Sequence, residues 1–354
     1  MNNQNAGIFF DCERMKYPHT GLYHFCLQLG RALLRQRRPT DEELSFFLPK
    51  QCRDLFPGQP AVSPNPLFKQ WMLFARNARL WHSTYQQSDY FPYGSRARKV
   101  LTIHDLNFLH ENKSTRRRRY YLRDLQRKIE HTDSIVTISN FVRKELLEHL
   151  DIGGKEVSVV YNGCNIQDNV QARKPSFPVN RPFLLSIGAV VPKKNFHVLP
   201  ATLLNNDFEL IIAGVAGNRE YQNRILEEAS RLGVQNRIRI TGPVTEEEKY
   251  WLLQNCELFC FPSLAEGFGL PVIEAMHFGK NVLLSPATSL PEIGGPYAHY
   301  FDSFDTDDIS TVTTSALEQI QRSDVSLEIQ NWSRQFSWTK TADDYLAIYR
   351  ELLR

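Results

Sequence analysis

The sequence lacks several patterns that would decide its class at once. Its 354 residues include 6 cysteines, none in a C-x-x-C pair, and 10 histidines without the spacing of a metal site. No early segment combines a basic start, an apolar run and a small-residue cleavage site, so we expect no export signal and reduced cysteines. The longest apolar runs, such as 208–216, are too short to cross a bilayer. We therefore expect a cytoplasmic protein, and leave open a peripheral position on the inner face of the cell membrane.

Signatures of nucleotide cofactors and of metal-held diphosphates are missing as well. There is no P-loop, no G-x-G-x-x-G fingerprint after the first expected strand, and no Asp-x-Asp pair at the end of an expected strand. We expect neither a cofactor nor a site metal. A nucleic-acid-binding protein is suggested only by the run Arg116, Arg117, Arg118 and Arg119, which lacks interleaved aromatics and a recognised module, so we expect no nucleic-acid partner.

Charge is unevenly distributed along this chain of net charge +3. Residues 1–165 contain 25 Lys and Arg against 16 Asp and Glu, and the remainder contains 17 against 23. This asymmetry favours an anionic partner for the first half, such as a membrane surface or a phosphorylated acceptor. Because consecutive helical residues point in different directions, a solvated helix face is the alternative interpretation of the four arginines.

Short apolar segments alternate with amphipathic ones, which predicts parallel sheets with helices on both faces. Strands are expected at 6–10, 44–48, 99–103, 134–138 and 157–160, and then at 183–187, 209–213, 237–241, 257–261 and 281–284. Helices are expected at 22–36, 115–131, 140–149, 195–204, 219–232, 246–254, 272–278 and 338–353. The sequence thus predicts an α/β protein with Rossmann-like domains at 1–165 and 182–335, a polar linker at 166–181 and a closing helix within 336–354.

Glu266 and Glu274 bracket the most informative segment, a Gly-Phe-Gly-Leu-Pro turn. An apolar strand-like segment precedes the turn and a helix-like segment follows it. Ligands bind at the carboxyl ends of parallel strands, helix N-termini attract anions, and glycines let a backbone approach a ligand. The pattern therefore predicts a ligand beside Glu266, with Glu274 one turn into the helix. Ordinary α/β architecture with solvated glutamates is the alternative.

The string from Glu266 to Glu274 resembles the signature of retaining glycosyltransferases of family 4, which have the GT-B fold with two Rossmann-like domains facing across a cleft. The resemblance implies that Glu274 binds the ribose of a nucleotide sugar. It also implies that the hexose is bound by Glu266 and the turn, which comprises Gly267, Phe268, Gly269 and Leu270.

Lys193 and Lys194 lie in a segment similar to the one with which this family binds the donor diphosphate. An Arg often follows the glycine of that segment in the family, but Ala189 stands there in this sequence. Lys194 matches the family's lysine, and Lys193 is a candidate to replace the missing charge. Lysine ammonium groups suit a diphosphate leaving group.

In the first half, His104 follows an expected strand in Thr-Ile-His-Asp-Leu, which resembles the family motif that faces the donor sugar. The resemblance implies that His104 bonds the hexose or polarises the reaction centre, and a structural histidine is the alternative. Gly21 opens the expected helix 22–36, whose N-terminal amides suit a phosphate. The family usually has two glycines there, so a plain turn is the alternative. The resemblance also implies that the closing helix crosses back onto the first domain.

These features predict a metal-independent hexosyltransferase that moves a sugar from a nucleotide sugar to a glycan or lipid-linked acceptor hydroxyl, with retention at the anomeric carbon. His104, Lys194 and Glu266 are the expected catalytic residues. The Lys-Lys-Asn and Ser-Leu-Pro-Glu strings resemble those of bacterial surface-polysaccharide and lipopolysaccharide mannosyltransferases, which favours GDP-mannose. The alternatives are a UDP-hexose or UDP-HexNAc donor, and a non-catalytic protein that binds nucleotide sugars or glycans.

Overall fold

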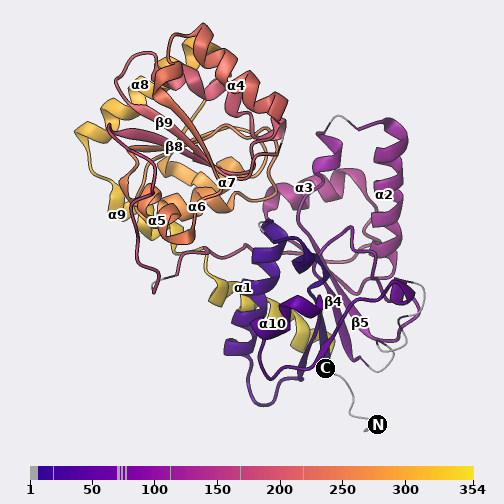
Figure 1. Ribbon diagram of the computed structural model, residues 1–354. Coiled ribbons are helices and arrows are strands. Elements are labelled where there is room, and N and C mark those ends of the chain that lie inside the picture. Colours follow the sequence, from indigo (N-terminus) through magenta and orange to yellow (C-terminus); the bar gives the residue numbers. More distant parts are fainter. Residues whose placement is uncertain are drawn as a thin grey trace. The chain divides into compact units, whose positions relative to one another are not determined.

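The computed structural model describes residues 7–18, 20–69, 72, 75, 78–111, 113–167, 169–217 and 219–354. The chain divides into two units, one made of Met1–Gly163 with Phe336–Arg354 and the other of Cys164–Gln335 (Figure 1). Each unit is built on one sheet whose paired strands are parallel. The predicted α/β class with two Rossmann-like sheets is confirmed. Ala6, at the start of the first expected strand, lies outside the described residues.

The sheet of the first unit has the order β3-β2-β1-β4-β5-β6-β7. Its strands are β1 (Ile8–Asp11), β2 (Leu44–Phe47), β3 (Ala61–Val62), β4 (Leu80–Ser83), β5 (Arg98–Ile103), β6 (Ser134–Thr137) and β7 (Val157–Val159). β1, β2 and β4 are buried along their whole length, as expected for parallel strands covered on both faces. The sequence did not predict β3, which has two residues, or β4, which ends in the polar pair His82 and Ser83.

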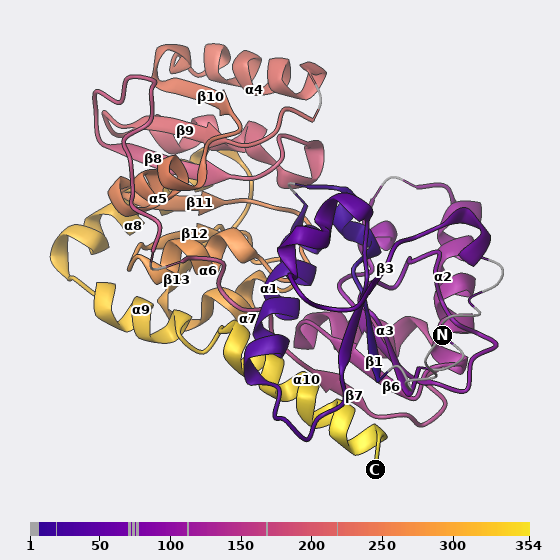
Figure 2. The same ribbon diagram turned by 60° about the horizontal axis from the view of Figure 1, so that its bottom comes forward.

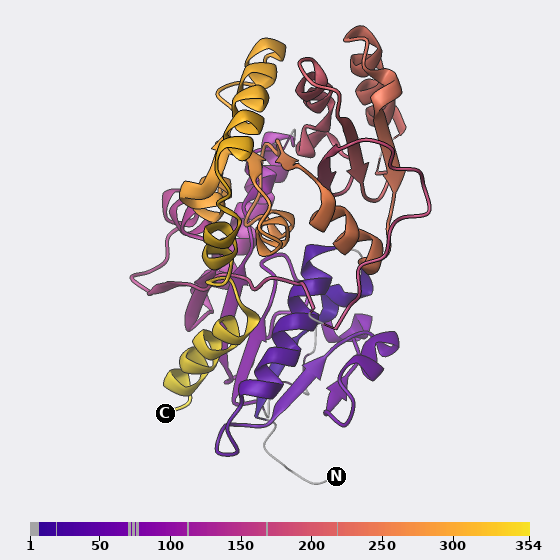
Figure 3. The same ribbon diagram turned by 90° about the vertical axis from the view of Figure 1, so that its left-hand side faces the viewer.

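The helices of the first unit are α1 (Gly21–Gln36), α2 (Thr115–Glu130), α3 (Asn140–His149) and α10 (Trp338–Leu352), within two residues of the predicted bounds. Short 3-10 segments are η1 (Glu13–Lys16), η2 (Lys50–Leu55), η3 (Pro66–Lys69) and η5 (Asn107–Leu109). A Ser or Thr side chain caps each of the four α-helices. α10 packs against α1, and Trp338, Tyr345 and Tyr349 belong to the same core as Phe10 (Figure 3, yellow and indigo).

The sheet of the second unit has the order β10-β9-β8-β11-β12-β13, which Figure 2 shows strand by strand. Its strands are β8 (Phe183–Ile187), β9 (Glu209–Ala213), β10 (Ile238–Gly242), β11 (Leu258–Phe261), β12 (Val282–Leu284) and β13 (Ala298–Tyr300). β13 was not predicted. Successive strands run outward from β8 on one side and from β11 on the other. The strand order therefore reverses between β8 and β11, which is where ligands bind in open parallel sheets.

The helices of the second unit are α4 (Arg219–Arg231), α5 (Glu246–Asn255), α6 (Leu270–His277), α7 (Leu290–Gly294), α8 (Thr306–Arg322) and α9 (Ser326–Ser333), with 3-10 segments η6 (Pro192–Lys194), η7 (Phe196–Leu203), η8 (Gln235–Arg237) and η9 (Gly295–Tyr297). α6 packs against α5 and α9, whereas η7 packs against α4 and α8. The prediction of an α-helix at 195–204 is wrong in type, because Phe196–Leu203 forms the 3-10 helix η7. Pro200 inside it has no N–H for a helical hydrogen bond.

Candidate active site

Two loops of the second unit carry most of the residues predicted to bind the donor, and a third loop lies beside them. The loop after β8 contains Lys193 and Lys194, the loop after β11 contains Glu266, and the loop after β12 contains Thr288. Because β8, β11 and β12 are adjacent and parallel, these loops meet at one edge of the sheet. The N–H of Leu264 donates to the carbonyl oxygen of Lys193 at 2.9 Å, which joins the first two loops directly.

Lys194 and Glu266 form an ion pair at this edge. Lys194 Nζ lies 2.5 Å from Glu266 Oε1, and the hydroxyl of Ser263 donates to the same oxygen at 2.5 Å. Burial alone would raise the pKa of Glu266, but the charges of Lys194 and Lys193 and the hydrogen bonds from Lys194 and Ser263 outweigh it and leave the pKa lowered. The ammonium of Lys194 also lies 4.6 Å from the centre of the Phe261 ring. The edge thus combines two cations with an ionised carboxylate.

The glycine turn is fixed by hydroxyl groups from the loop after β12. The N–H of Glu266 donates to Thr288 Oγ1 at 3.1 Å, and Ser289 Oγ lies 3.0 Å from the carbonyl oxygen of Glu266 and 2.9 Å from that of Phe268. Gly269 has φ 119°, and a Cβ there would lie 3.0 Å from Leu290. The turn therefore requires glycine at 269. Gly267 and Phe268 are buried, and Leu270 is the first residue of α6.

Glu274 lies one turn into α6 and is only 5% exposed. Its carboxylate oxygen Oε2 lies 3.4 Å from the ammonium of Lys249 on α5, which also lies 2.9 Å from Glu246. Sequence reasoning did not single out Lys249 or Thr288. Each comes from an element other than the glycine turn and its helix, and nothing in the local pattern marks either residue.

His104 follows β5 in the first unit and is 8% exposed. Its Nε2 donates to the carbonyl oxygen of Thr84 at 2.8 Å, so the proton of the neutral ring lies on Nε2. Burial lowers the pKa of His104 to about 4, which keeps the ring neutral at pH 7. The side chain of Gln86 accepts from the N–H of His104 at 3.1 Å and donates to the carbonyl oxygen of Asp105 at 2.7 Å. Gln86, which the sequence did not indicate, fixes the turn that presents His104.

Gly21 is the first residue of α1, after the cap residue Thr20, whose hydroxyl accepts from the N–H of Tyr23 at 3.3 Å. A Cβ at position 21 would meet no atom within 4 Å. Local packing therefore does not require glycine here, although the open space is compatible with a ligand. His19, two residues earlier in the predicted turn, lies outside the described residues.

The four consecutive arginines do not share one face of α2. Arg116 and Arg119 line a hollow of about 350 Å³ together with Thr115, Tyr120 and Arg123. Arg118 instead donates to the carbonyl oxygen of Glu111 at 2.8 Å, and Arg117 is exposed outside the hollow. Tyr120 is 65% exposed between the arginines. The basic face of α2 is therefore made of Arg116, Arg119, Tyr120 and Arg123.

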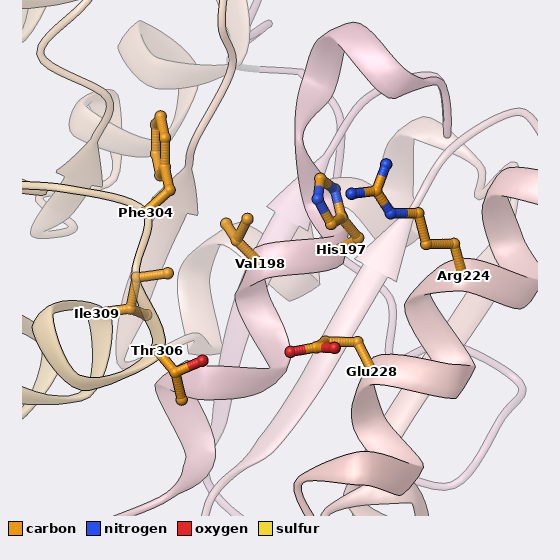
Figure 4. Close-up of a pocket in the computed structure, with 7 residues that line it drawn as sticks. All are labelled: His197, Val198, Arg224, Glu228, Phe304, Thr306 and Ile309. Atoms are coloured by element: carbon orange, nitrogen blue, oxygen red, sulfur yellow. The ribbon is translucent and has the colours of Figure 1, made fainter.

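Another hollow, of about 240 Å³, lies among η7, α4 and α8 (Figure 4). It is lined by apolar side chains together with His197, Arg224, Glu228 and Thr306, and by none of the predicted donor-binding residues. Among the described residues there is no group of three or more His, Cys, Asp and Glu placed to bind a metal ion. In the same part of the chain, no helix combines the length and the apolar character needed to span a membrane.

Two family descriptions match successive parts of the chain. Residues 25–168 match "Glycosyltransferase Family 4", and residues 167–324 match "Glycosyl transferases group 1". The second range contains the ion pair, the glycine turn and Glu274. The two ranges together extend from α1 to α8.

Several relatives of this chain are named as mannosyltransferases. A serotype-specific mannosyltransferase WbdA of Escherichia coli is 31% identical over 248 residues, which are 65% of this chain and 30% of that protein. The chain thus spans less than a third of that relative. O-antigen chain mannosyltransferase B of E. coli is 26% identical over 385 aligned residues, which cover 98% of this chain and 100% of that protein.

A solved structure with the same fold is Anabaena Alr3699/HepE in complex with UDP and glucose. Its TM-score is 0.76 at 17% sequence identity, with 98% of this chain and 99% of that chain covered. At this level of identity, the likeness establishes the fold.

Proposed function

Since this chain belongs to the glycosyltransferases with the GT-B fold, we propose that it transfers mannose from GDP-mannose to a hydroxyl of a glycan or lipid-linked acceptor in surface-polysaccharide synthesis. The observation that carries this proposal is the meeting of Lys193, Lys194 and Glu266 at the edge where the strand order reverses, with Glu274 in the adjoining helix. The O-antigen mannosyltransferase that aligns with nearly the whole chain supports mannose as the sugar.

In the proposed reaction, the ammonium groups of Lys193 and Lys194 neutralise the diphosphate as its bond to the sugar breaks. Glu266 and the backbone of the glycine turn bind the hexose hydroxyls, and Glu274 binds the ribose. His104, a neutral ring whose Nε2 proton is already donated to Thr84, can accept a hydrogen bond from a hexose hydroxyl through Nδ1.

The acceptor hydroxyl attacks the anomeric carbon from the side that the leaving diphosphate vacates, so the configuration is retained. The acceptor's proton passes to the leaving diphosphate. The new bond joins the acceptor oxygen to the anomeric carbon, and GDP leaves with the proton. No covalent intermediate on the protein is needed in this scheme.

We also propose that the protein works at an anionic membrane surface. The support is the basic face of α2, where Arg116, Arg119 and Arg123 surround the exposed ring of Tyr120. Arginines bind lipid phosphates, and a tyrosine ring suits the interface between headgroups and acyl chains.

A thermal-shift panel of GDP-mannose, GDP, UDP-glucose, UDP-N-acetylglucosamine and UDP tests the donor. We expect stabilisation by the guanine nucleotides, and a preference for uracil would replace GDP-mannose with a UDP-linked sugar. Incubation with the preferred donor and an acceptor glycan, followed by NMR of the product, reports transfer and its stereochemistry. Binding without transfer or donor hydrolysis would indicate a non-catalytic nucleotide-sugar-binding protein.

Metal dependence is tested in the same assay. We propose that lysines and backbone amides bind the diphosphate, so activity should survive EDTA. A loss of activity that added Mg²⁺ or Mn²⁺ restores would contradict this part of the proposal.

A further inference from the structure

Glu274 is a carboxylate with very little access to water. Its side chain is 6% exposed on α6, within a helix whose other residues from Val272 to Met276 are also buried. Burying an ionised carboxylate is costly unless a cation or hydrogen-bond donors compensate for the lost water. A ribose-binding carboxylate must nevertheless stay ionised, because only then do both oxygens accept hydrogen bonds.

Lys249 supplies the compensating charge from a different helix. Its ammonium on α5 lies 3.4 Å from Glu274 Oε2 and 2.9 Å from Glu246 Oε2, and its side chain is 12% exposed. Burial would lower the pKa of Lys249, but the charges of Glu274 and Glu246 and a hydrogen bond with Glu246 raise it above its ordinary value. Lys249 is therefore a cation over the whole physiological range.

Apart from His277, three residues further along α6, the other titratable groups around Glu274 add no positive charge to this pair. α5 also contributes Tyr250, and the segment before β8 contributes Cys164, whose pKa is raised to about 12 by burial and then by the charge of Glu274. Of the remaining elements packed against α6, α7 carries Glu292 and α9 carries Glu328. β11 and β12 are apolar.

We infer that Lys249 is a positioning residue of the donor site, which keeps Glu274 ionised and turns its Oε2 toward α5 so that Oε1 is presented to the ribose hydroxyls. This inference rests on the proposed function, because it assumes that Glu274 binds the nucleotide.

The test compares two substitutions of the lysine. Lys249→Met removes the charge at nearly constant length, and Lys249→Arg retains it. Affinities for GDP and UDP are measured by calorimetry between pH 5.5 and pH 8.5. We expect Lys249→Met to bind the preferred nucleotide about tenfold more weakly at pH 7, because a charge-assisted contact to the ribose is impaired.

The pH dependence separates positioning from a merely structural role. Without the ammonium, the buried carboxylate takes up a proton at higher pH. The loss of nucleotide affinity in Lys249→Met relative to wild type should therefore grow as pH falls and shrink toward pH 8.5. Lys249→Arg should recover most of the affinity. At saturating donor, kcat of Lys249→Met should stay near the wild-type value while KM for the donor rises.

Lys340→Met is the matched control, because it removes an exposed lysine that pairs with Asp344 on α10. It should leave affinity and its pH dependence unchanged. If Lys249→Met does not fold, Lys249→Gln takes its place, since an amide can still donate to Glu274 without carrying charge.

Three outcomes overturn the inference. They are wild-type nucleotide affinity in Lys249→Met at every pH, a loss of affinity in Lys249→Met that does not change with pH, and an affinity in Lys249→Arg as low as in Lys249→Met. Glu274→Gln reports separately on the proposed function. If Glu274→Gln binds nucleotide as tightly as wild type, the ribose assignment itself fails, whatever Lys249 does.

Discussion

Thr288 accepts a hydrogen bond from the backbone N–H of Glu266 at 3.1 Å while its own backbone has φ 59°. A β-branched residue in this left-handed region is strained by about 1–3 kcal/mol. Such strain persists only where the surroundings impose it, and here the Thr288 hydroxyl and the neighbouring Ser289 together fix the glycine turn. The strained residue thus fixes the backbone of Glu266, whose carboxylate is expected to bind the hexose.

This relationship predicts that the side chain of Thr288 stabilises the fold, whereas its strained backbone destabilises it. Thr288→Ala keeps the strain and removes the acceptor of the Glu266 N–H, so it should lower both stability and kcat/KM. Thr288→Gly also loses the acceptor but relieves the strain, and should melt at a higher temperature than Thr288→Ala. Calorimetric melting and steady-state kinetics of both variants test this. A lower melting temperature for the glycine variant would show that the conformation is not strained.

Replacing Lys194 with Met should lower turnover more than donor affinity. Negative charge increases on the diphosphate in the transition state, so losing the ammonium should cost about 100-fold or more in kcat. Lys193→Met should also reduce kcat if Lys193 replaces the arginine absent at position 189. Wild-type kinetics in the Lys193 variant would remove that residue from the reaction.

The same ion pair predicts a pH dependence of stability. The folded pKa of Glu266 lies below the ordinary value of 4.5, so the pair stabilises the fold above that value, and the stabilisation is lost as pH falls through the folded pKa. Lys194→Met should be less stable than wild type at pH 7, and its free energy of unfolding should fall less as the pH decreases. Urea unfolding of both proteins between pH 3 and pH 7 measures the free energy of unfolding at each pH. If this free energy falls equally with decreasing pH in both proteins, the prediction is wrong.

Tyr349→Phe should destabilise the first unit without affecting donor binding. The hydroxyl of Tyr349 lies 2.6 Å from His82 Nδ1, and His82 Nε2 lies 2.7 Å from the hydroxyl of Thr102, in a fully buried network. Burial lowers the pKa of His82 to about 3, so the ring is neutral and needs these partners. Losing one should cost about 1–3 kcal/mol in unfolding free energy, measured by denaturant titration. Phe46→Leu provides a size-change control within the same core.

The basic face of α2 should bind anionic vesicles. Replacing Arg116, Arg119 and Arg123 with Gln should weaken co-sedimentation with phosphatidylglycerol vesicles by roughly two orders of magnitude at low salt, and salt should weaken wild-type binding. Donor affinity should not change.

The matched control removes the same charge elsewhere in the first unit, by replacing Arg35, Lys50 and Arg96, all exposed, with Gln. If both triple variants lose binding equally, the attraction depends on net charge and not on the face of α2.

The fold was predictable where one kind of local pattern dominates. β8 and β9 coincide with the predicted strands because continuous apolar runs mark buried parallel strands. β4 was missed because the polar residues His82 and Ser83 interrupt its apolar pattern. His82 can be buried in the strand because it forms a hydrogen bond with Tyr349, which lies 267 residues away in the sequence. α8 was missed because its many Thr and Ser residues give a weak helical signal.

The residues of the candidate site were likewise predictable only where a local motif marks them. Glu266, Glu274 and the lysines lie in strings that are informative by themselves, and the structure places the lysine pair beside Glu266. Lys249 and Thr288 act on these residues from another helix and another loop, and Gln86 acts in the same way on His104. Their contribution depends on tertiary contacts, which local spacing does not encode.

The last helix has a consequence for how the two units can be separated. Because α10 completes the core of the first unit, the second unit is an uninterrupted insertion from Cys164 to Gln335, whereas the first is made of two pieces. A truncation from the C-terminus would therefore damage the N-terminal unit. Chimeras between related enzymes should exchange the insertion at Gly163–Cys164 and Gln335–Phe336. The loops proposed to bind the donor are then transplanted together, and the host's own α1 and α10 remain partners.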